Sequence, residues 1–319
     1  MRELYMRIKE NRFTLILQPI IILVLIGGIF FVMTGGNFLN PRNINIIIQQ
    51  AMIVATVSTG ACFIFATGNV NIAMGSCTAL IATLASMTYM ATKSAPIMFI
   101  VAILLGVGIM FICVLLSTML KVMVIHVTIV MMTLLTAIQS TILGGASINL
   151  PYSMTSVINK AFVPYIITAA FVIFSIVVFH LTPVGRHIKM IGSNEKAAEL
   201  TGLTRAKALT IAFIIAGIGA GLAALLTIFR TGSITNTTGG SINTDVMIAI
   251  VLGGMPIFGG SKSRAYAPLI GAVTVTALNN GLLMIGVGAS FVQGLRGLIF
   301  LLLLLLGNRR SQLLPAREG

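Results

Sequence analysis

The chain has 319 residues, of which 57% are hydrophobic and only 8% are charged, and its mean hydropathy is +1.07. A soluble domain carries about a quarter charged residues because its surface must face water, so the composition excludes a soluble fold. The formal net charge of +14 could suggest a nucleic-acid partner, but the basic residues are dispersed among apolar runs without interleaved aromatic residues. The composition predicts an all-α polytopic membrane protein that contacts the lipid bilayer and binds no nucleic acid.

About ten membrane segments are predicted along the chain, because a helix needs about 20 apolar residues to cross a bilayer. They form a single transmembrane domain over residues 1–319. The first apolar run follows a basic segment but is too long for a signal peptide and lacks a cleavage pattern, so we expect it to be uncleaved. Polar or glycine-rich stretches interrupt the second, third and eighth segments, so some segments are expected to be broken or re-entrant. The ten are Phe13–Thr34, Ile44–Thr67, Ile72–Ala91, Pro96–Leu120, Val122–Leu143, Phe162–Thr182, Ala208–Phe229, Thr244–Phe258, Tyr266–Val287 and Ser290–Gly307.

Lysines and arginines are distributed unevenly between the two sides that ten crossings would create. One side would hold 15 of them, namely Arg2, Arg7, Lys9, Arg12, Lys121, Arg186, Lys189, Lys196, Arg205, Lys207, Lys262, Arg264, Arg309, Arg310 and Arg317. The other side would hold four, Arg42, Lys93, Lys160 and Arg230, and Arg296 alone falls within a span. Because cytoplasmic loops carry the excess of basic residues, this distribution predicts that both termini and the connection at about 183–207 are cytoplasmic.

Residues for enzymatic chemistry are missing. The three histidines are far apart, and Asp245 is the only acid near a membrane segment, so no carboxylate pair is available for proton transfer. A phosphate loop would need a lysine where Gly260 stands. Cys62, Cys77 and Cys113 lie in apolar runs without the spacing of metal ligands, and we interpret them as core residues. We therefore expect no catalytic site, no metal and no cofactor, and any nucleotide hydrolysis must occur on another chain.

Polar and glycine-rich breaks occur in two of the apolar segments, and an amide pair occurs in a third. Such breaks persist in a membrane only where they are buried in protein or line an aqueous cavity. One interpretation is that they form a translocation pathway or gate, as broken segments do in transporters. The other is that the glycines permit close helix packing, that the first break is a tight turn, and that the amide pair joins helices. The residues concerned are Asn69, Asn71, Ser76, Asp245, Gly253, Gly254, Asn279 and Asn280.

The connection at about 183–207 contains the signals of a short helix. Asn194 can cap its start, Glu195–Leu200 would form the helix, and Gly202 would stop it. A short cytoplasmic helix of this kind suits docking by a soluble partner, whereas the alternative is a simple basic connector. The residues proposed for docking are Gly192, Asn194, Glu195, Ala197, Ala198, Glu199 and Gly202, with the two alanines small enough for close approach.

Three sequence blocks resemble the permease subunits of bacterial ABC importers, in the ribose, xylose, galactoside and autoinducer branch. The blocks are residues 182–202, residues 245–260, and residues 271–281 with the Asn279–Asn280–Gly281 motif. The first half agrees only through residues 67–76, and there Asn71 stands where the family usually has an acid. The stretch 124–133 also matches the family pattern poorly.

The resemblance implies a permease subunit in the bacterial plasma membrane that passes a small polar solute, a sugar or sugar-like compound. It implies three partners: an ATP-binding cassette ATPase that binds the ATP, a second permease copy or paralogue, and an extracytoplasmic solute-binding protein. The connection at 183–207 would then couple the permease to the ATPase. Two alternatives stay open at this point, an ABC permease for nucleosides or other polar solutes and an ion-coupled secondary transporter.

Overall fold

The computed structural model describes residues 12–155, 162–256 and 259–312, with side chains omitted at 12–18, 300 and 302–312. Nearly all of the regular structure is helical, as predicted. In chain order the elements are α2 (Arg12–Met33), η1 (Asn37–Leu39), α3 (Pro41–Ala66), α4 (Met74–Thr92), α5 (Ala95–Met119), α6 (Val124–Leu143), β1 (Ile148–Asn149), α8 (Val163–Leu181), α9 (Pro183–Ser193), α10 (Glu195–Leu200), α11 (Arg205–Thr231), β2 (Ser233–Ile234), α12 (Ile242–Leu252), α13 (Ala267–Met284) and α14 (Ala289–Gln312).

Seven of the described helices are long and apolar enough to cross a membrane, namely α3, α4, α5, α6, α8, α11 and α13. Two shorter apolar stretches accompany them, Pro19–Met33 within α2 and the whole of α12. At 1.5 Å per residue, the 11 residues of α12 extend about 16 Å, roughly half of a bilayer core. The prediction that the eighth segment is broken is therefore confirmed, whereas the total of ten crossings stays a prediction.

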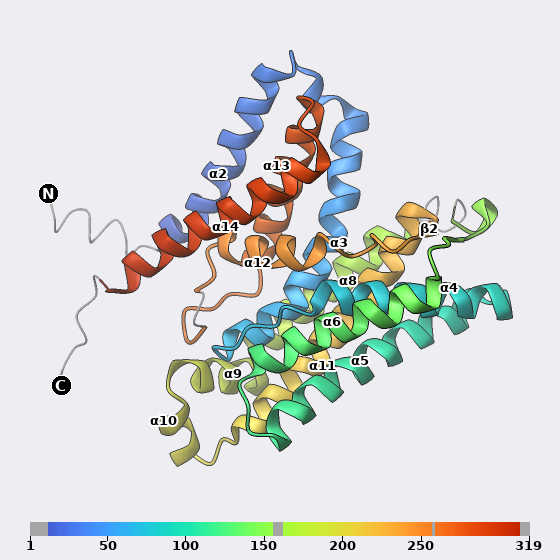
Figure 1. The fold of residues 1–319 in the computed structure, drawn as a ribbon. Coiled ribbons are helices and arrows are strands. Elements are labelled where there is room, and N and C mark those ends of the chain that lie inside the picture. Colours follow the sequence, from blue (N-terminus) through green and yellow to red (C-terminus); the bar gives the residue numbers. More distant parts are fainter. Residues whose placement is uncertain (1–11, 156–161, 257–258, 313–319) are drawn as a thin grey trace, which may run out of the picture.

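The helices form two groups that share α3 (Figure 1). Helices α2 and α14 pack on α13, which contacts α3, whereas α4, α5 and α6 pack on one another; α4 and α5 also pack on α11, which contacts α3 together with α8, and α12 contacts both groups. Asn40 caps the start of α3 by accepting a hydrogen bond from the backbone nitrogen of Arg42 at 3.1 Å, and Pro41 occupies the first turn. Helices α3 and α11 are largely buried, whereas α5 and α6 are mostly exposed.

Close contact between α5 and α11 depends on glycines. A Cβ atom at Gly106 of α5 would overlap the carbonyl oxygen of Gly217, and one at Gly221 of α11 would lie 2.6 Å from the carbonyl oxygen of Ala102. Small residues spaced four apart allow membrane helices to approach closely, so packing replaces the hydrophobic effect that lipid removes. Cys62, Cys77 and Cys113 are free and buried, which confirms their interpretation as core residues.

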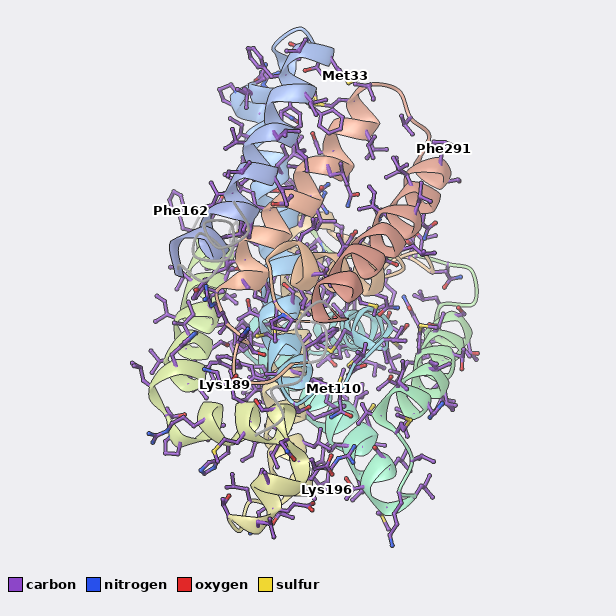
Figure 2. The ribbon with its side chains drawn as sticks, turned by 90° about the vertical axis from the view of Figure 1, so that its left-hand side faces the viewer. Met33, Met110, Phe162, Lys189, Lys196 and Phe291 are labelled. Atoms are coloured by element: carbon purple, nitrogen blue, oxygen red, sulfur yellow. The ribbon has the colours of Figure 1, made fainter. Side chains whose placement is uncertain are left out.

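Several connections meet at one end of the second helix group. Helices α9 and α10 lie there, beside the α5–α6 connection, whereas the strand pair β1–β2 lies at the opposite end (Figure 1). Figure 2 shows Lys196 at one end of the molecule and Met33 and Phe291 at the other. The basic connections around Lys121, 183–207 and Arg264 are thus on one side, which is the arrangement that the positive-inside count requires.

Candidate functional site

Helices α9 and α10 form an L-shaped unit between α8 and α11 (Figure 1). Sequence reasoning predicted only the helix Glu195–Leu200 in this connection and missed α9, which contains Gly185 and Gly192. In the structure both glycines allow backbone contact: a Cβ atom at Gly185 would overlap the carbonyl oxygen of Phe179. Ile188 and Ile191 of α9 are buried, whereas Arg186 is exposed, so α9 is amphipathic and lies on the end of the bundle.

Helix α10 begins and ends at the predicted residues, Glu195 and Leu200. The side chain of Asn194 accepts a hydrogen bond from the backbone nitrogen of Ala197 at 3.1 Å, which confirms the cap. Gly202 has a φ of 84°, a left-handed conformation that other residues adopt only with strain, which confirms its role as the stop. The backbone amide of Gly202 donates to the carbonyl oxygen of Glu199 at 2.9 Å.

The surface that α10 presents to solvent is partly apolar. Leu200 is 90% exposed, and Lys196, Ala197 and Glu199 are exposed beside it. Ala198, in contrast, is 2% exposed and packs inside the chain, so it is not available to a partner in this conformation. Sequence reasoning placed Leu200 in the helix without a contact role, yet its exposure makes it the most accessible apolar side chain of the unit.

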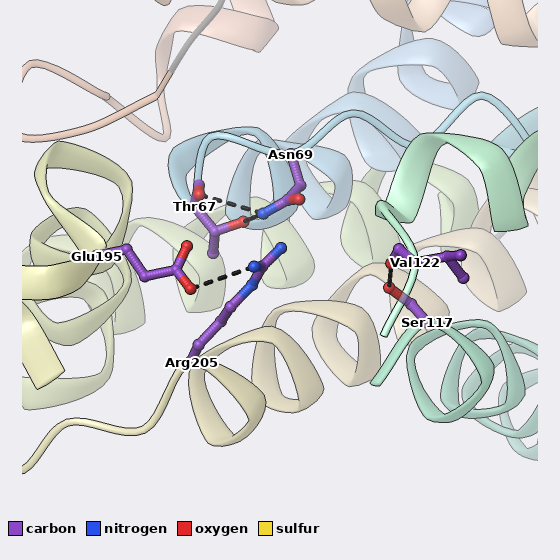
Figure 3. A network of polar contacts seen from close by, with 6 residues as sticks. All are labelled: Thr67, Asn69, Ser117, Val122, Glu195 and Arg205. Atoms are coloured by element: carbon purple, nitrogen blue, oxygen red, sulfur yellow. Dashed lines mark hydrogen bonds and ion pairs between the residues drawn. The ribbon is translucent and has the colours of Figure 1, made fainter. Parts of the chain in front are cut away.

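Figure 3 shows the polar contacts in and beside this unit, of which one ion pair holds α10 against α11. Arg205, at the start of α11, forms an ion pair with Glu195 at 3.2 Å, with both side chains about two-fifths exposed (39% and 43%). Asn69 donates to the backbone and hydroxyl oxygens of Thr67 at 3.2 and 3.0 Å, so it stabilises the turn after α3 rather than lining an open space. On α9, partial burial of Lys189, whose Nζ lies 4.4 Å from the centre of the Phe179 ring, lowers the pKa of its ammonium group.

A pocket of about 370 Å³ lies beside this unit. The α5–α6 connection contributes Ser117 and Lys121, and the α10–α11 region contributes Glu199 and Arg205. The pocket carries charges of both signs and several hydroxyl groups, which suits a polar segment of a protein partner better than an apolar ligand.

A buried polar cluster joins α12, α13 and α14. Asp245 of α12 forms an ion pair with Arg296 of α14, with 3.5 Å between Oδ1 and the guanidinium nitrogen, and side-chain exposures of 7% and 12%. Asn279 of α13 lies between them, because its amide donates to Asp245 Oδ1 at 3.2 Å and its oxygen accepts from Arg296 Nε at 2.7 Å. Sequence reasoning identified Asp245 and Asn279 but assigned Arg296 no role. Asp245 lies in the first turn of α12, and the cap position of that helix is Ser241.

The first break is a buried turn. Asn71 is 1% exposed, its side-chain oxygen accepts from the backbone nitrogen of Ala73 at 2.8 Å, and its amide lies 3.3 Å from the sulfur of Met110. Ser76 is also buried and accepts a hydrogen bond from Thr136 at 3.0 Å. These contacts fit the turn-and-packing interpretation in this conformation.

The second break lies at the end of α12. A Cβ atom at Gly253 would overlap the carbonyl oxygen of Ala267, so this glycine allows a close backbone contact. Gly254 has a φ of 85°, a left-handed conformation that favours glycine. The side-chain oxygen of Asn280 is buried and has no hydrogen-bond partner among the described residues. Asn279, at the adjacent position, joins helices as the second interpretation predicted.

A second pocket, of about 220 Å³, lies near the start of α3, the start of α8 and the end of α11, where it is lined by Asn45, Gln49, Tyr165 and Arg230 among others. The Tyr165 hydroxyl donates to the side-chain oxygen of Asn45 at 3.2 Å. These groups can donate to and accept from hydroxyl groups of a polar solute. None of the predicted pathway residues lines either pocket.

Comparisons with known proteins give consistent results. Residues 43–306 match the protein family described as branched-chain amino acid transport system, permease component. The ribose import permease protein RbsC of Escherichia coli is 28% identical over 284 residues, which cover 86% of this chain and 88% of that protein. RbsC of Bacillus subtilis is 28% identical over 91% of each chain. The autoinducer 2 import system permease protein LsrC of Yersinia enterocolitica is 26% identical over 96% of this chain and 85% of that protein. No solved structure matches the chain.

Proposed function

Because the chain belongs to the family of permease components of branched-chain amino acid transport systems, we propose that it carries a small polyhydroxylated solute of the ribose type across the membrane. It is a multi-pass membrane permease of a bacterial ABC importer, and it is a non-catalytic transport subunit. The observation that supports the solute class is the match to ribose permeases over 86% of the chain. Nucleosides and other polar solutes are the alternatives within this importer class.

The proposed partners follow from the importer class. An ATP-binding cassette ATPase would bind ATP and dock on the α9–α10 unit, a second permease copy or paralogue would complete the pathway, and a solute-binding protein would deliver solute from the opposite side. The ion-coupled alternative does not fit this family. It also depended on Asp245 as a free carboxylate, and that side chain is paired with Arg296.

The energy source can be tested by reconstitution. The permease, its ATPase and its binding protein are placed in proteoliposomes without an ion gradient, and uptake of labelled ribose is measured with ATP. We expect ATP-dependent uptake that unlabelled ribose abolishes and that a panel of nucleosides leaves unchanged. If the permease alone took up ribose in response to a proton or sodium gradient, the proposal would be contradicted. If nucleosides competed with ribose, the proposed solute class would have to change to nucleosides.

The proposed orientation can be tested by cysteine labelling in intact cells. The three native cysteines are buried, so the wild type is the background control. A cysteine at the exposed position Lys196 should resist an impermeant thiol reagent, whereas cysteines at the exposed positions Asn37 and Asn236 should react. The reason is the excess of basic residues on the side of Lys196. Labelling of the Lys196→Cys variant from outside would overturn the orientation.

A further inference from the structure

Three chain segments meet closely where α9 ends. They are the end of α3 at Ala66, the end of α9 at Gly192 and Ser193, and the segment Gly259–Ser261. The backbone nitrogen of Gly260 donates to the carbonyl oxygen of Ala66 at 3.0 Å, and the backbone nitrogen of Ser261 donates to Ser193 Oγ at 2.8 Å. We call this set of residues the three-segment junction.

Two positions of this junction have no room for a side chain and therefore require glycine. A Cβ atom at Gly192 would overlap the carbonyl oxygen of Ala66 and lie 2.8 Å from the nitrogen of Gly260. A Cβ atom at Gly259 would overlap the carbonyl oxygen of Phe65. Gly259 and Gly260 also have φ values of 67° and 89°, which disfavour other residues. The backbones of Ala66, Gly192 and Gly260 are therefore in direct contact, and no side chain at these glycine positions separates them.

Aromatic and cationic side chains surround the junction and hold the same segments together. The His180 ring at the end of α8 stacks on Tyr266 with 5.9 Å between centres, and the Arg264 guanidinium donates to the Tyr266 hydroxyl at 2.9 Å. Phe179 packs edge-on against Phe63 of α3 at 5.2 Å and faces Lys189 of α9. Helices α3, α8 and α9 and the 264–266 segment are thus fixed to one another.

The first broken segment begins at this junction, and the second lies a few residues before it in the chain. The turn at 67–73 follows Ala66 directly and leads to α4 through Asn71. The second break, which ends α12 at Gly253 and Gly254, is followed six residues later by Gly259. At the other end of α12, the Asn243 side chain accepts a hydrogen bond from the backbone nitrogen of Gly75 in α4 at 2.5 Å. A displacement of α9 would therefore act on the first break directly at Ala66, and on α12 through α4 and the Gly75–Asn243 hydrogen bond.

We propose that the three-segment junction is the element that positions both broken segments in response to the α9–α10 unit, and that it moves as one body during transport. Gly192, Ser193 and Gly260 are then positioning residues for solute translocation. The inference rests on the proposed docking of an ATPase at this unit. It goes further by naming the contact through which docking would act.

The first test is a crosslink across the junction. In the double variant Ser193→Cys, Ser261→Cys, mild oxidation should form a disulfide because Ser193 Oγ lies against the backbone of Ser261. If the junction moves as one body, the oxidised protein keeps ATP-driven ribose uptake within about twofold of the reduced protein. Loss of uptake on oxidation with recovery on reduction would show that the contact must open, and failure to crosslink would show that it is not assembled. Either result overturns the proposal.

The second test is a wedge with a matched control. Gly192→Ala places a methyl group against Ala66, whereas Gly108→Ala places one in open space on α5, and both glycines are helical. We expect Gly192→Ala to reduce uptake by tenfold or more while the ATPase still co-purifies and hydrolyses ATP, and Gly108→Ala to behave as wild type. Full uptake by a Gly192→Ala variant that accumulates in the membrane would overturn the proposed role of the junction. Should this variant fail to accumulate, the crosslink decides. If the wild-type protein shows no ATP-driven uptake, that result would instead contradict the proposed function.

Discussion

Neutralising either Asp245 or Arg296 alone should destabilise the permease by about 3–5 kcal/mol, because each change leaves the other charge buried without its partner. For a protein of this size the corresponding fall in the midpoint of thermal unfolding is on the order of 10 °C. Asp245→Asn keeps the size of the side chain and removes only its charge, and Arg296→Gln keeps a shorter polar side chain without the charge. Unfolding of the detergent-purified protein, followed by the fraction that stays soluble on heating, checks this.

The double variant Asp245→Asn, Arg296→Gln separates pairing from other effects. The double variant leaves no buried charge without a partner, so it should recover most of the stability that each single variant loses. Arg42→Gln is a matched control, since Arg42 is exposed and has no ion-pair partner among the described residues. Equal stability of wild type and Asp245→Asn, or simple addition of the two single effects in the double variant, would show that the pair does not hold α12 to α14.

Replacing Leu200 with aspartate should abolish ATP-driven uptake while the permease still accumulates in the membrane. Leu200 is 90% exposed at the tip of α10, so the change does not disturb packing within the chain. A side chain that is a hot spot of a protein contact contributes about 2 kcal/mol or more; we expect Leu200 to have this role, so the ATPase should bind roughly thirtyfold more weakly. Co-purification of the ATPase with the variant, together with uptake by proteoliposomes, measures both effects.

Leu200→Met supplies the control for that experiment, because it keeps an apolar side chain of similar size and should keep wild-type uptake. Ala197→Trp adds bulk on the same exposed surface and should also prevent docking. Ala198→Trp would not be informative, since Ala198 is buried and its variant would disturb the fold. Normal ATPase binding and uptake by Leu200→Asp would leave α10 as a connector without a docking role.

The limits of α10 could be predicted from sequence because they depend on local chemistry. Asn194 caps the helix with its own side chain, and Gly202 takes a backbone conformation that favours glycine. The extent of α9 could not be predicted in this way. Its glycines serve contacts with residues distant in the sequence, such as Gly192 with Ala66, and such contacts leave no local pattern.

Arg296 was missed for a similar reason. A single arginine in an apolar run shows no partner in the sequence, and its pairing with Asp245 depends on how α12, α13 and α14 are placed together. Asn71, in contrast, was correctly recognised as the site of a break, but its burial among Ala73, Met74 and Met110 could not be inferred from spacing. Local turns were therefore predictable, and contacts between distant segments were not.

The central position of α3 has a consequence for how the protein is made. Membrane helices enter the bilayer in chain order, so α3 must reside among lipids before α11 and α13, which later surround it, have been synthesised. The Thr56 hydroxyl donates to the carbonyl oxygen of Met52 at 2.8 Å, and the Ser58 hydroxyl donates to that of Ala55 at 3.3 Å. Since both acceptors belong to the same helix, these hydroxyl groups are satisfied without any neighbour. These two polar groups are therefore already hydrogen-bonded while the newly inserted helix is still surrounded by lipid.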